Sequence, residues 1–196
     1  DRTGGPMTLT TTAIGVVPAG QIVRRGGARR GHVVFVSGCI GDATLGLRLR
    51  LDPALRDGYG LDRECTGRLL ARFDTPRPPV ALAPVLLAHA SAARDISDGL
   101  AKDFLTLCRT SRVVGEVELA RLPLSEGGRR ALASGRASEV LATVPRDRAA
   151  AFVTAAEGAG VKVTAIGTIV GEGDTARFLD SEGRPVRLAA TGWEHL

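Results

Sequence analysis

Two aspartates and a serine lie within four residues of each other near the middle of the chain. They belong to the segment Asp-Ile-Ser-Asp-Gly-Leu at positions 95–100, which follows a largely apolar stretch. Carboxylates bind divalent cations, and a helix that begins beside them presents backbone N–H groups to a phosphate. This spacing therefore predicts a site for a metal and a phosphate. On the alternative interpretation, Asp98 only caps the helix and Asp95 is a solvated loop residue.

An amphipathic helix is expected directly after this segment. The apolar residues at helical spacing are Leu100, Phe104, Leu107 and Cys108. Asp98 is a favourable N-cap residue, and Gly99 is tolerated as the first residue of the helix. The positive end of the helix dipole would then face the loop, where an anion is stabilised. The same pattern predicts that Cys108 lies in the core.

The rest of the chain alternates between the two apolar periodicities of strands and helices. Strands are expected at 8–17, 33–37, 113–119, 140–144, 161–170, 176–180 and 185–189. Helices are expected at 42–51, 61–72, 79–93, 125–133 and 146–158. This order indicates a mixed sheet covered by helices, which is an α+β or α/β arrangement.

Composition places the chain among ordinary globular proteins. Its 196 residues, 44% of them hydrophobic and 24% charged, suffice for one substantial core or for one domain plus part of another. No apolar run approaches the roughly 20 residues that cross a bilayer, so no membrane contact and a cytoplasmic location are expected. The widely spaced Cys39, Cys65 and Cys108 indicate neither a disulfide framework nor a zinc site.

The net charge of +5 raises the question of nucleic-acid binding. Only two of the 26 basic residues are lysines, and the arginines are scattered along the chain. Aromatic residues make up 4% of the sequence, too few for a platform on which bases stack. Nucleic acid is therefore not expected as a partner.

The segment 95–100, with Asp103 after it, resembles the signature of the thiamine-monophosphate kinases, members of the superfamily that includes aminoimidazole ribonucleotide synthetase. Further stretches resemble that family in the same order along the chain, namely 17–20, 25–28, 41–43, 122–124 and 192–195. The resemblance implies the three-layer α/β/α C-terminal domain of the superfamily, with a mixed sheet, over residues 18–196. Residues 1–17 would be the tail of an N-terminal ATP-binding domain that the sequence otherwise lacks.

The resemblance also implies an activity, the ATP-dependent phosphorylation of thiamine monophosphate to thiamine diphosphate with Mg²⁺. Asp95 and Asp98 are then expected as magnesium ligands, and Ser97 as a contact of the ATP. Arg25 is expected to reach the ATP phosphates. A solvated arginine in a turn with three other arginines is the alternative for Arg25.

Two further residues are implied as contacts of thiamine monophosphate. Trp193 would stack on the thiamine ring, and its alternative is an apolar plug that fastens the tail to the core. Glu139 precedes an expected strand where the family carries Gly-Gly-acidic-Asp-Tyr-Glu. This chain has Ser-Gly-Arg-Ala-Ser-Glu at 134–139, so only Glu139 keeps its place. A solvated glutamate at a strand edge is the alternative.

Three functional classes follow from the sequence. The first is the kinase, acting as a homodimer through the absent N-terminal domain, with residues 1–196 inactive by themselves. The second is another ATP-dependent synthetase of the same superfamily. The third is a non-catalytic binding module, which the departure at 134–139 favours.

Overall fold

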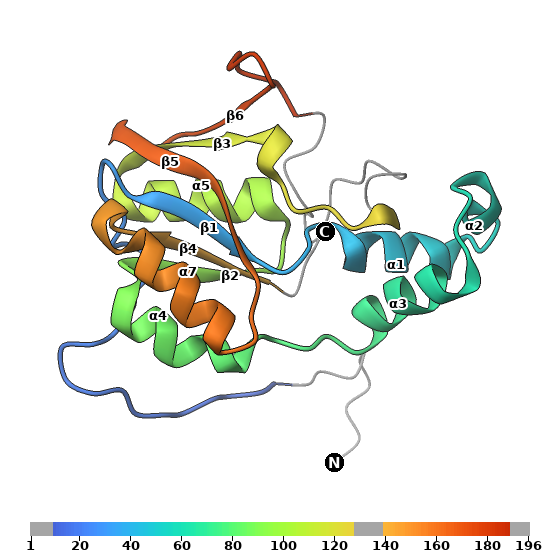
Figure 1. The fold of residues 1–196 in the computed structure, drawn as a ribbon, viewed down its shortest axis with the longest axis horizontal. Coiled ribbons are helices and arrows are strands. Elements are labelled where there is room, and N and C mark those ends of the chain that lie inside the picture. The colour runs from blue at the N-terminus through green and yellow to red at the C-terminus, as the bar shows by residue number, and fades with distance from the viewer. Residues whose placement is uncertain (1–9, 128–138, 189–196) are drawn as a thin grey trace, which may run out of the picture.

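A mixed β-sheet forms the centre of the protein. The computed structural model describes residues 10–127 and 139–188, and within them six strands lie in the order β2-β4-β1-β5-β3-β6 (Figure 1). The strands are β1 (Val33–Ser37), β2 (Ala92–Ile96), β3 (Val113–Glu118), β4 (Glu139–Val144), β5 (Val163–Glu172) and β6 (Ala176–Leu179). Only the pairing of β3 with β6 is parallel among these strands, and the other neighbours are antiparallel.

Helices cover both faces of this sheet and extend beyond one end of it. The described helices are α1 (Asp42–Leu51), α2 (Leu55–Gly58), α3 (Arg63–Asp74), α4 (Ala83–His89), α5 (Leu100–Ser111) and α7 (Ala149–Gly158). Short 3-10 turns lie at η1 (Val80–Leu82), η2 (Leu119–Arg121) and η3 (Arg146–Arg148). Helix α5 lies on one face and α4 with α7 on the other, while α1 and α3 pack together beside the sheet (Figure 1). The α+β class and the three layers are therefore as predicted.

Two apolar clusters hold the layers together. On one face, Phe104 and Leu107 of α5 are fully buried against the sheet, with Cys108 beside them as predicted. On the other face, Phe152 of α7 meets Phe35 of β1 edge to face, with 5.0 Å between the ring centroids. Each apolar stripe read from the sequence thus covers one face of the sheet.

The predicted helix at 79–93 is wrong over its last four residues, 90–93. Helix α4 ends at His89, Ala90 is extended, and Ala92 begins β2. The Ser91 N–H donates a hydrogen bond of 2.8 Å to the Thr143 carbonyl, which aligns the chain with β4. Pairing with a strand about fifty residues away outweighs the local helical pattern.

Both predicted terminal strands are also corrected. Residues 10–17 form no strand in the part of the chain that the structure describes, and Ile14 is 94% exposed. An alternating pattern becomes a strand only where a neighbour accepts its hydrogen bonds. The described part of the predicted strand at 185–189, residues 185–188, makes a single bridge, Leu179 to Pro185, and proline has no N–H to extend a ladder. The predicted helix at 125–133 lies mostly outside the described residues.

Candidate functional site

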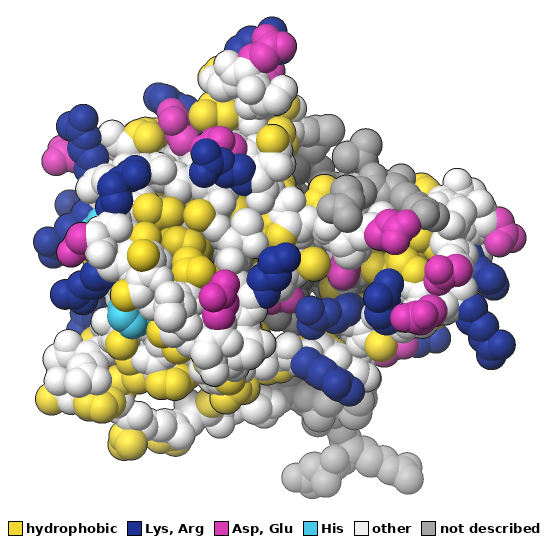
Figure 2. Space-filling view, in the orientation of Figure 1, with side chains coloured by type: hydrophobic (Ala, Val, Ile, Leu, Met, Phe, Trp, Pro, Cys, Tyr) yellow, Lys and Arg dark blue, Asp and Glu magenta, His cyan; other side chains and the backbone are white. Residues whose placement is uncertain are grey.

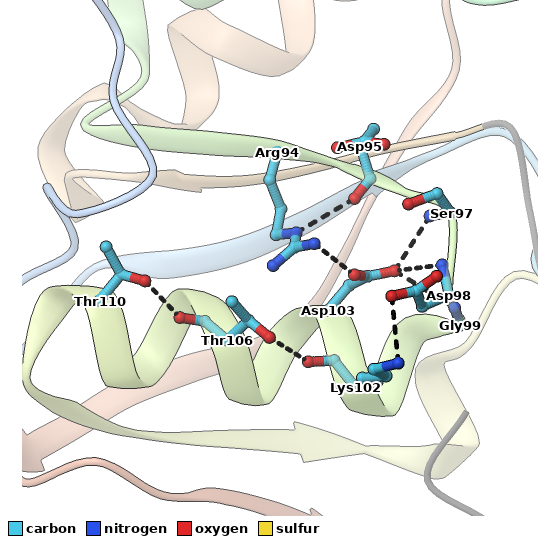
Figure 3. A network of polar contacts seen from close by, with 9 residues as sticks. All are labelled: Arg94, Asp95, Ser97, Asp98, Gly99, Lys102, Asp103, Thr106 and Thr110. Atoms are coloured by element: carbon cyan, nitrogen blue, oxygen red, sulfur yellow. Dashed lines mark hydrogen bonds and ion pairs between the residues drawn. The ribbon is translucent and has the colours of Figure 1, made fainter. Parts of the chain in front are cut away.

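The loop that joins β2 to α5 carries two of the predicted site residues, Ser97 and Asp98, and Asp95 lies in β2 just before it. The shape of the loop is set by Asp103, a fully buried residue in the first turn of α5. One oxygen of Asp103, Oδ2, accepts the N–H groups of Ser97 and Asp98 at 3.0 Å each and that of Gly99 at 3.2 Å (Figure 3). The side chain of the helix thus fixes the loop that leads into it.

The prediction that Asp98 caps α5 is wrong. The N-cap is Gly99, whose φ of 116° is a conformation that glycine adopts readily, and no side chain caps the helix from that position. Asp98 instead forms an ion pair with Lys102, with 3.3 Å between Oδ2 and Nζ, and its side chain is 26% exposed. Its carboxylate therefore does not cap the start of the helix.

A buried arginine faces Asp103 from the sheet. Arg94 of β2 lies on the same face as α5, and its Nη2 is 2.6 Å from Asp103 Oδ1. The two side chains are 9% and 0% exposed. Burial raises the pKa of Asp103, while the N–H of Asp98 and the charge of Arg94 act in the opposite direction. The pair is a desolvated contact between sheet and helix.

Asp95 projects to the other face of the sheet. Successive residues of a strand point to opposite faces, so Asp95 points away from the helix that its neighbour Arg94 contacts (Figure 3). Asp95 is exposed, and the described residues contain no group of three or more His, Cys, Asp or Glu side chains arranged for a metal. Within this described part of the chain, Asp95 and Asp98 thus belong to no such group of three.

Both carboxylates nevertheless suit Mg²⁺ chemically. Magnesium takes oxygen ligands, keeps several waters and is commonly held by one or two carboxylates together with substrate phosphates. Asp95 and Asp98 are accessible from solvent at the end of β2, and Ser97 between them is exposed as well. The loop can thus contribute ligands to an ion that a phosphate also binds.

Glu139 lies next to this loop but has partners of its own. As the first residue of β4 it pairs with Ile96, the residue before the loop. Its carboxylate accepts hydrogen bonds from Ser37 Oγ at 2.5 Å and from Arg72 Nη2 at 3.1 Å. Glu139 is 6% exposed, so the interpretation as a solvated edge residue is wrong.

The surroundings of Glu139 favour its protonated form more than water does. Burial raises the pKa of Glu139, although the Ser37 hydrogen bond and the charge of Arg72 lower it. Close approach requires a glycine at position 38, where φ is 56° and a Cβ would meet the Glu139 carboxyl group. Because Arg72 belongs to α3, Glu139 also fastens the α1–α3 pair to the sheet.

A second acid, Asp42, lies at the start of α1 near this cluster. It accepts a hydrogen bond of 2.5 Å from Ser125 Oγ, and burial raises its pKa. Burial raises the pKa of the nearby Cys39 thiol, and the charges of Asp42 and Glu139 raise it further. Two partly desolvated acids thus lie at the end of β1, beside the candidate loop.

The remaining predicted site residues do not join this group. Arg25 is exposed, and its carbonyl accepts a hydrogen bond of 3.3 Å from Ser111 Oγ at the last residue of α5. A helix rises about 1.5 Å per residue, so Arg25 lies about 16 Å along α5 from the candidate loop. Trp193 lies outside the described residues.

Sequence reasoning missed Asp103, Arg94, Ser37 and Arg72. A signal for Asp103 was present, because it lies on the apolar stripe that Leu100 and Phe104 define, and a charge there must be buried and paired. Arg94 alternates with the buried Ala92 and Ile96, which is the corresponding signal in a strand. Ser37 and Arg72 had no such signal.

The surface carries charges of both signs. On the face that Figure 2 shows, acidic side chains lie among the basic ones over the sheet and the helices. Within the described residues, no helix is both long and apolar enough to cross a membrane.

Comparisons with known proteins agree with this architecture. The family model described as "AIR synthase related protein, C-terminal domain" matches residues 29–180. The thiamine-monophosphate kinase of Caulobacter vibrioides is 38% identical over 98% of this chain and 56% of its own length.

Two solved structures are similar as well. The thiamine-monophosphate kinase of Stenotrophomonas maltophilia has a TM-score of 0.74 and 30% identity, over 87% of this chain and 56% of that one. AaThiL complexed with AMPPCP and TMP has a TM-score of 0.68 and 28% identity, over 89% and 54%. The chain thus spans a little over half the length of these relatives.

Proposed function

The chain belongs to the AIR synthase related protein C-terminal domain family, and on that basis we propose that it is the C-terminal part of a thiamine-monophosphate kinase. The complete protein would transfer the terminal phosphoryl group of ATP to thiamine monophosphate and form thiamine diphosphate. The observation that carries this proposal is the 38% identity to a thiamine-monophosphate kinase along 98% of the chain. The complex of a structural neighbour with AMPPCP and TMP supports the two substrates.

The demands of this reaction match the loop at the end of β2. Phosphoryl transfer between two anions depends mainly on alignment and on neutralising charge, and a bound Mg²⁺ would supply that neutralisation. We propose Asp95 and Asp98 as its ligands, because both are accessible carboxylates on either side of the loop. Ser97 is exposed, and its hydroxyl would donate a hydrogen bond to a phosphate oxygen of the ATP.

Glu139 and Trp193 are our proposed contacts of thiamine monophosphate. Support for Glu139 is its position opposite Ile96, one residue from the loop that would hold the nucleotide. Its carboxylate would have to recognise the substrate while bonded to Ser37 and Arg72, or exchange one of these bonds. The roles of Trp193 in stacking and of Arg25 in binding ATP phosphates rest on the family resemblance alone.

The organisation of the complete protein is also a proposal. Residues 1–17 would be the tail of an N-terminal ATP-binding domain, and residues 18–196 the C-terminal domain. The exposed apolar side chains at 14 and 16 support this, because they would pair with a strand of that domain. A homodimer through the same domain, a cytoplasmic location, and no contact with nucleic acid or membrane complete the proposal.

Two other functions remain as alternatives. Another ATP-dependent synthetase of the superfamily would use the same fold with a different substrate. A non-catalytic binding module is favoured by the departure from the family pattern at 134–139.

The test is an assay of the complete natural protein with ATP, Mg²⁺ and thiamine monophosphate. Chromatography should detect thiamine diphosphate, in a stoichiometric ratio to the ADP formed. ADP formed only with other acceptors would support the synthetase, and no turnover with any acceptor would support the binding module.

A further inference from the structure

The carboxylate of Asp103 occupies an anion site just before the start of α5. Three consecutive N–H groups converge on one oxygen of Asp103, in the arrangement that a bound phosphate oxygen would otherwise occupy. Asp103 is fully buried, so its carboxylate approaches these groups from the inside of the loop. Ser97 is exposed, and the Asp98 carboxylate pairs with Lys102 in the first turn of α5 (Figure 3).

Arg94 holds Asp103 from the opposite side. Its guanidinium contacts Asp103 Oδ1, while its Nε donates a hydrogen bond of 3.3 Å to the Asp95 carbonyl. Its Nη1 is buried without a hydrogen-bond partner among the described residues. Arg94 therefore joins the backbone of Asp95, the helix and the loop in one desolvated network.

We propose that Asp103 is a positioning residue for the nucleotide-binding loop 97–99 and that Arg94 locks it in place. This inference rests on the proposed kinase function and names what makes the site rigid. Because one carboxylate oxygen accepts three N–H groups of the loop, it holds the loop in a single backbone conformation. Ser97 and Asp98 are thereby held in place before any ligand arrives, which lowers the entropic cost of binding.

The same geometry restricts how a phosphate can be bound. The N–H groups of Ser97, Asp98 and Gly99 already donate to Asp103, so these three are not available to a phosphate of ATP. At this loop, a phosphate can instead be reached through the Ser97 hydroxyl and through a cation on Asp98. We therefore expect nucleotide binding at this loop to depend strictly on Mg²⁺.

The test compares four variants of the complete natural protein. Asp103→Asn keeps the shape but removes the charge, and Arg94→Met removes the lock. The double variant Arg94→Met/Asp103→Asn removes both charges, so it contains no unpaired buried ion. Cys108→Ala is the matched control, because Cys108 is buried on the same helix and does not contact the loop.

Both single variants should raise the KM for MgATP or lower kcat by about 10- to 100-fold, as is typical when a residue that orients a ligand group is lost. The KM for thiamine monophosphate should change little. The melting temperature of the double variant should recover, since no buried charge is unpaired, while its KM for MgATP should stay high. Cys108→Ala should lower only the melting temperature.

An unchanged KM and kcat in Asp103→Asn would overturn the proposal. Recovery of both the melting temperature and the KM in the double variant would overturn it too, because Asp103 would then serve stability alone. Failure of the kinase proposal is seen separately, as wild-type protein that makes no thiamine diphosphate. Hydrogen exchange at the amides of residues 97–99 tests the loop directly, and Asp103→Asn should accelerate it at all three together.

Discussion

The Ser37 hydroxyl at the end of β1 donates a hydrogen bond of 2.5 Å to the Glu139 carboxylate at the start of β4. The same Ser37 oxygen accepts the N–H of Val140 at 2.9 Å. Together with Arg72 of α3, this contact ties two neighbouring strands and the α1–α3 pair into one unit. Glu139 therefore has a structural role, whether or not it also meets the substrate.

Glu139 should make stability depend on pH in a defined direction. Its folded-state pKa lies above the ordinary 4.5, mainly because of burial. The folded state then binds the proton more tightly than the unfolded state, so the contribution of Glu139 is fully present below pH 4.5. It is lost as the pH rises through the folded-state pKa.

Chemical denaturation of wild type and Glu139→Gln across this range checks that prediction. As the pH rises, the unfolding free energy of the wild type should fall relative to that of Glu139→Gln. Using the difference cancels the titration of Asp103, the other buried acid of the described chain. A pH-independent difference would contradict the raised pKa.

Asp98→Asn should abolish phosphoryl transfer in the complete protein with little loss of stability. Loss of a metal-binding carboxylate should reduce turnover at least as much as the about 10- to 100-fold seen for residues that only orient such ligands. The fold should persist because Gly99, and not Asp98, is the N-cap of α5. Only the partly exposed pair with Lys102 is lost, and such pairs contribute little.

The measurement is turnover over a range of Mg²⁺ concentrations, alongside the melting temperature. Asp174→Asn is the control, since it removes the same charge from the exposed turn that follows β5. Wild-type turnover of Asp98→Asn at saturating Mg²⁺ would rule out its role as a ligand.

Trp193→Ala should weaken binding of thiamine monophosphate much more than binding of ATP. Loss of an aromatic ring that stacks on a base typically costs about 1–3 kcal/mol, and the thiamine heterocycle is comparable. Calorimetric titration of both ligands decides the matter. Equal losses for the two ligands would favour the apolar plug.

Residues 1–196 alone should not phosphorylate thiamine monophosphate, even with excess ATP and Mg²⁺. Transfer requires donor, metal and acceptor to be held together, and in the proposed organisation the N-terminal ATP-binding domain supplies part of that site. The exposed Ile14 and Val16 should also favour self-association. An assay for thiamine diphosphate and light scattering test both points, and turnover by a monodisperse sample would refute the prediction.

The sequence by itself determined the elements whose signals are local. The strand at 33–37 and the helix at 42–51 have the predicted bounds, and α5 follows the Asp-Ile-Ser-Asp-Gly-Leu segment as expected. Apolar periodicity and start signals act within a few residues of each other, so they can be read along the chain. The composition and the motifs likewise indicated the fold class and the family.

Only the tertiary structure decided which polar groups are buried and with which partners. Ala92 became part of a strand because Ser91 meets Thr143, and Glu139 became a buried anchor because Ser37 and Arg72 reach it. Strand pairing and the desolvation of a charge depend on groups far apart in the sequence, and folding alone brings them within hydrogen-bonding distance.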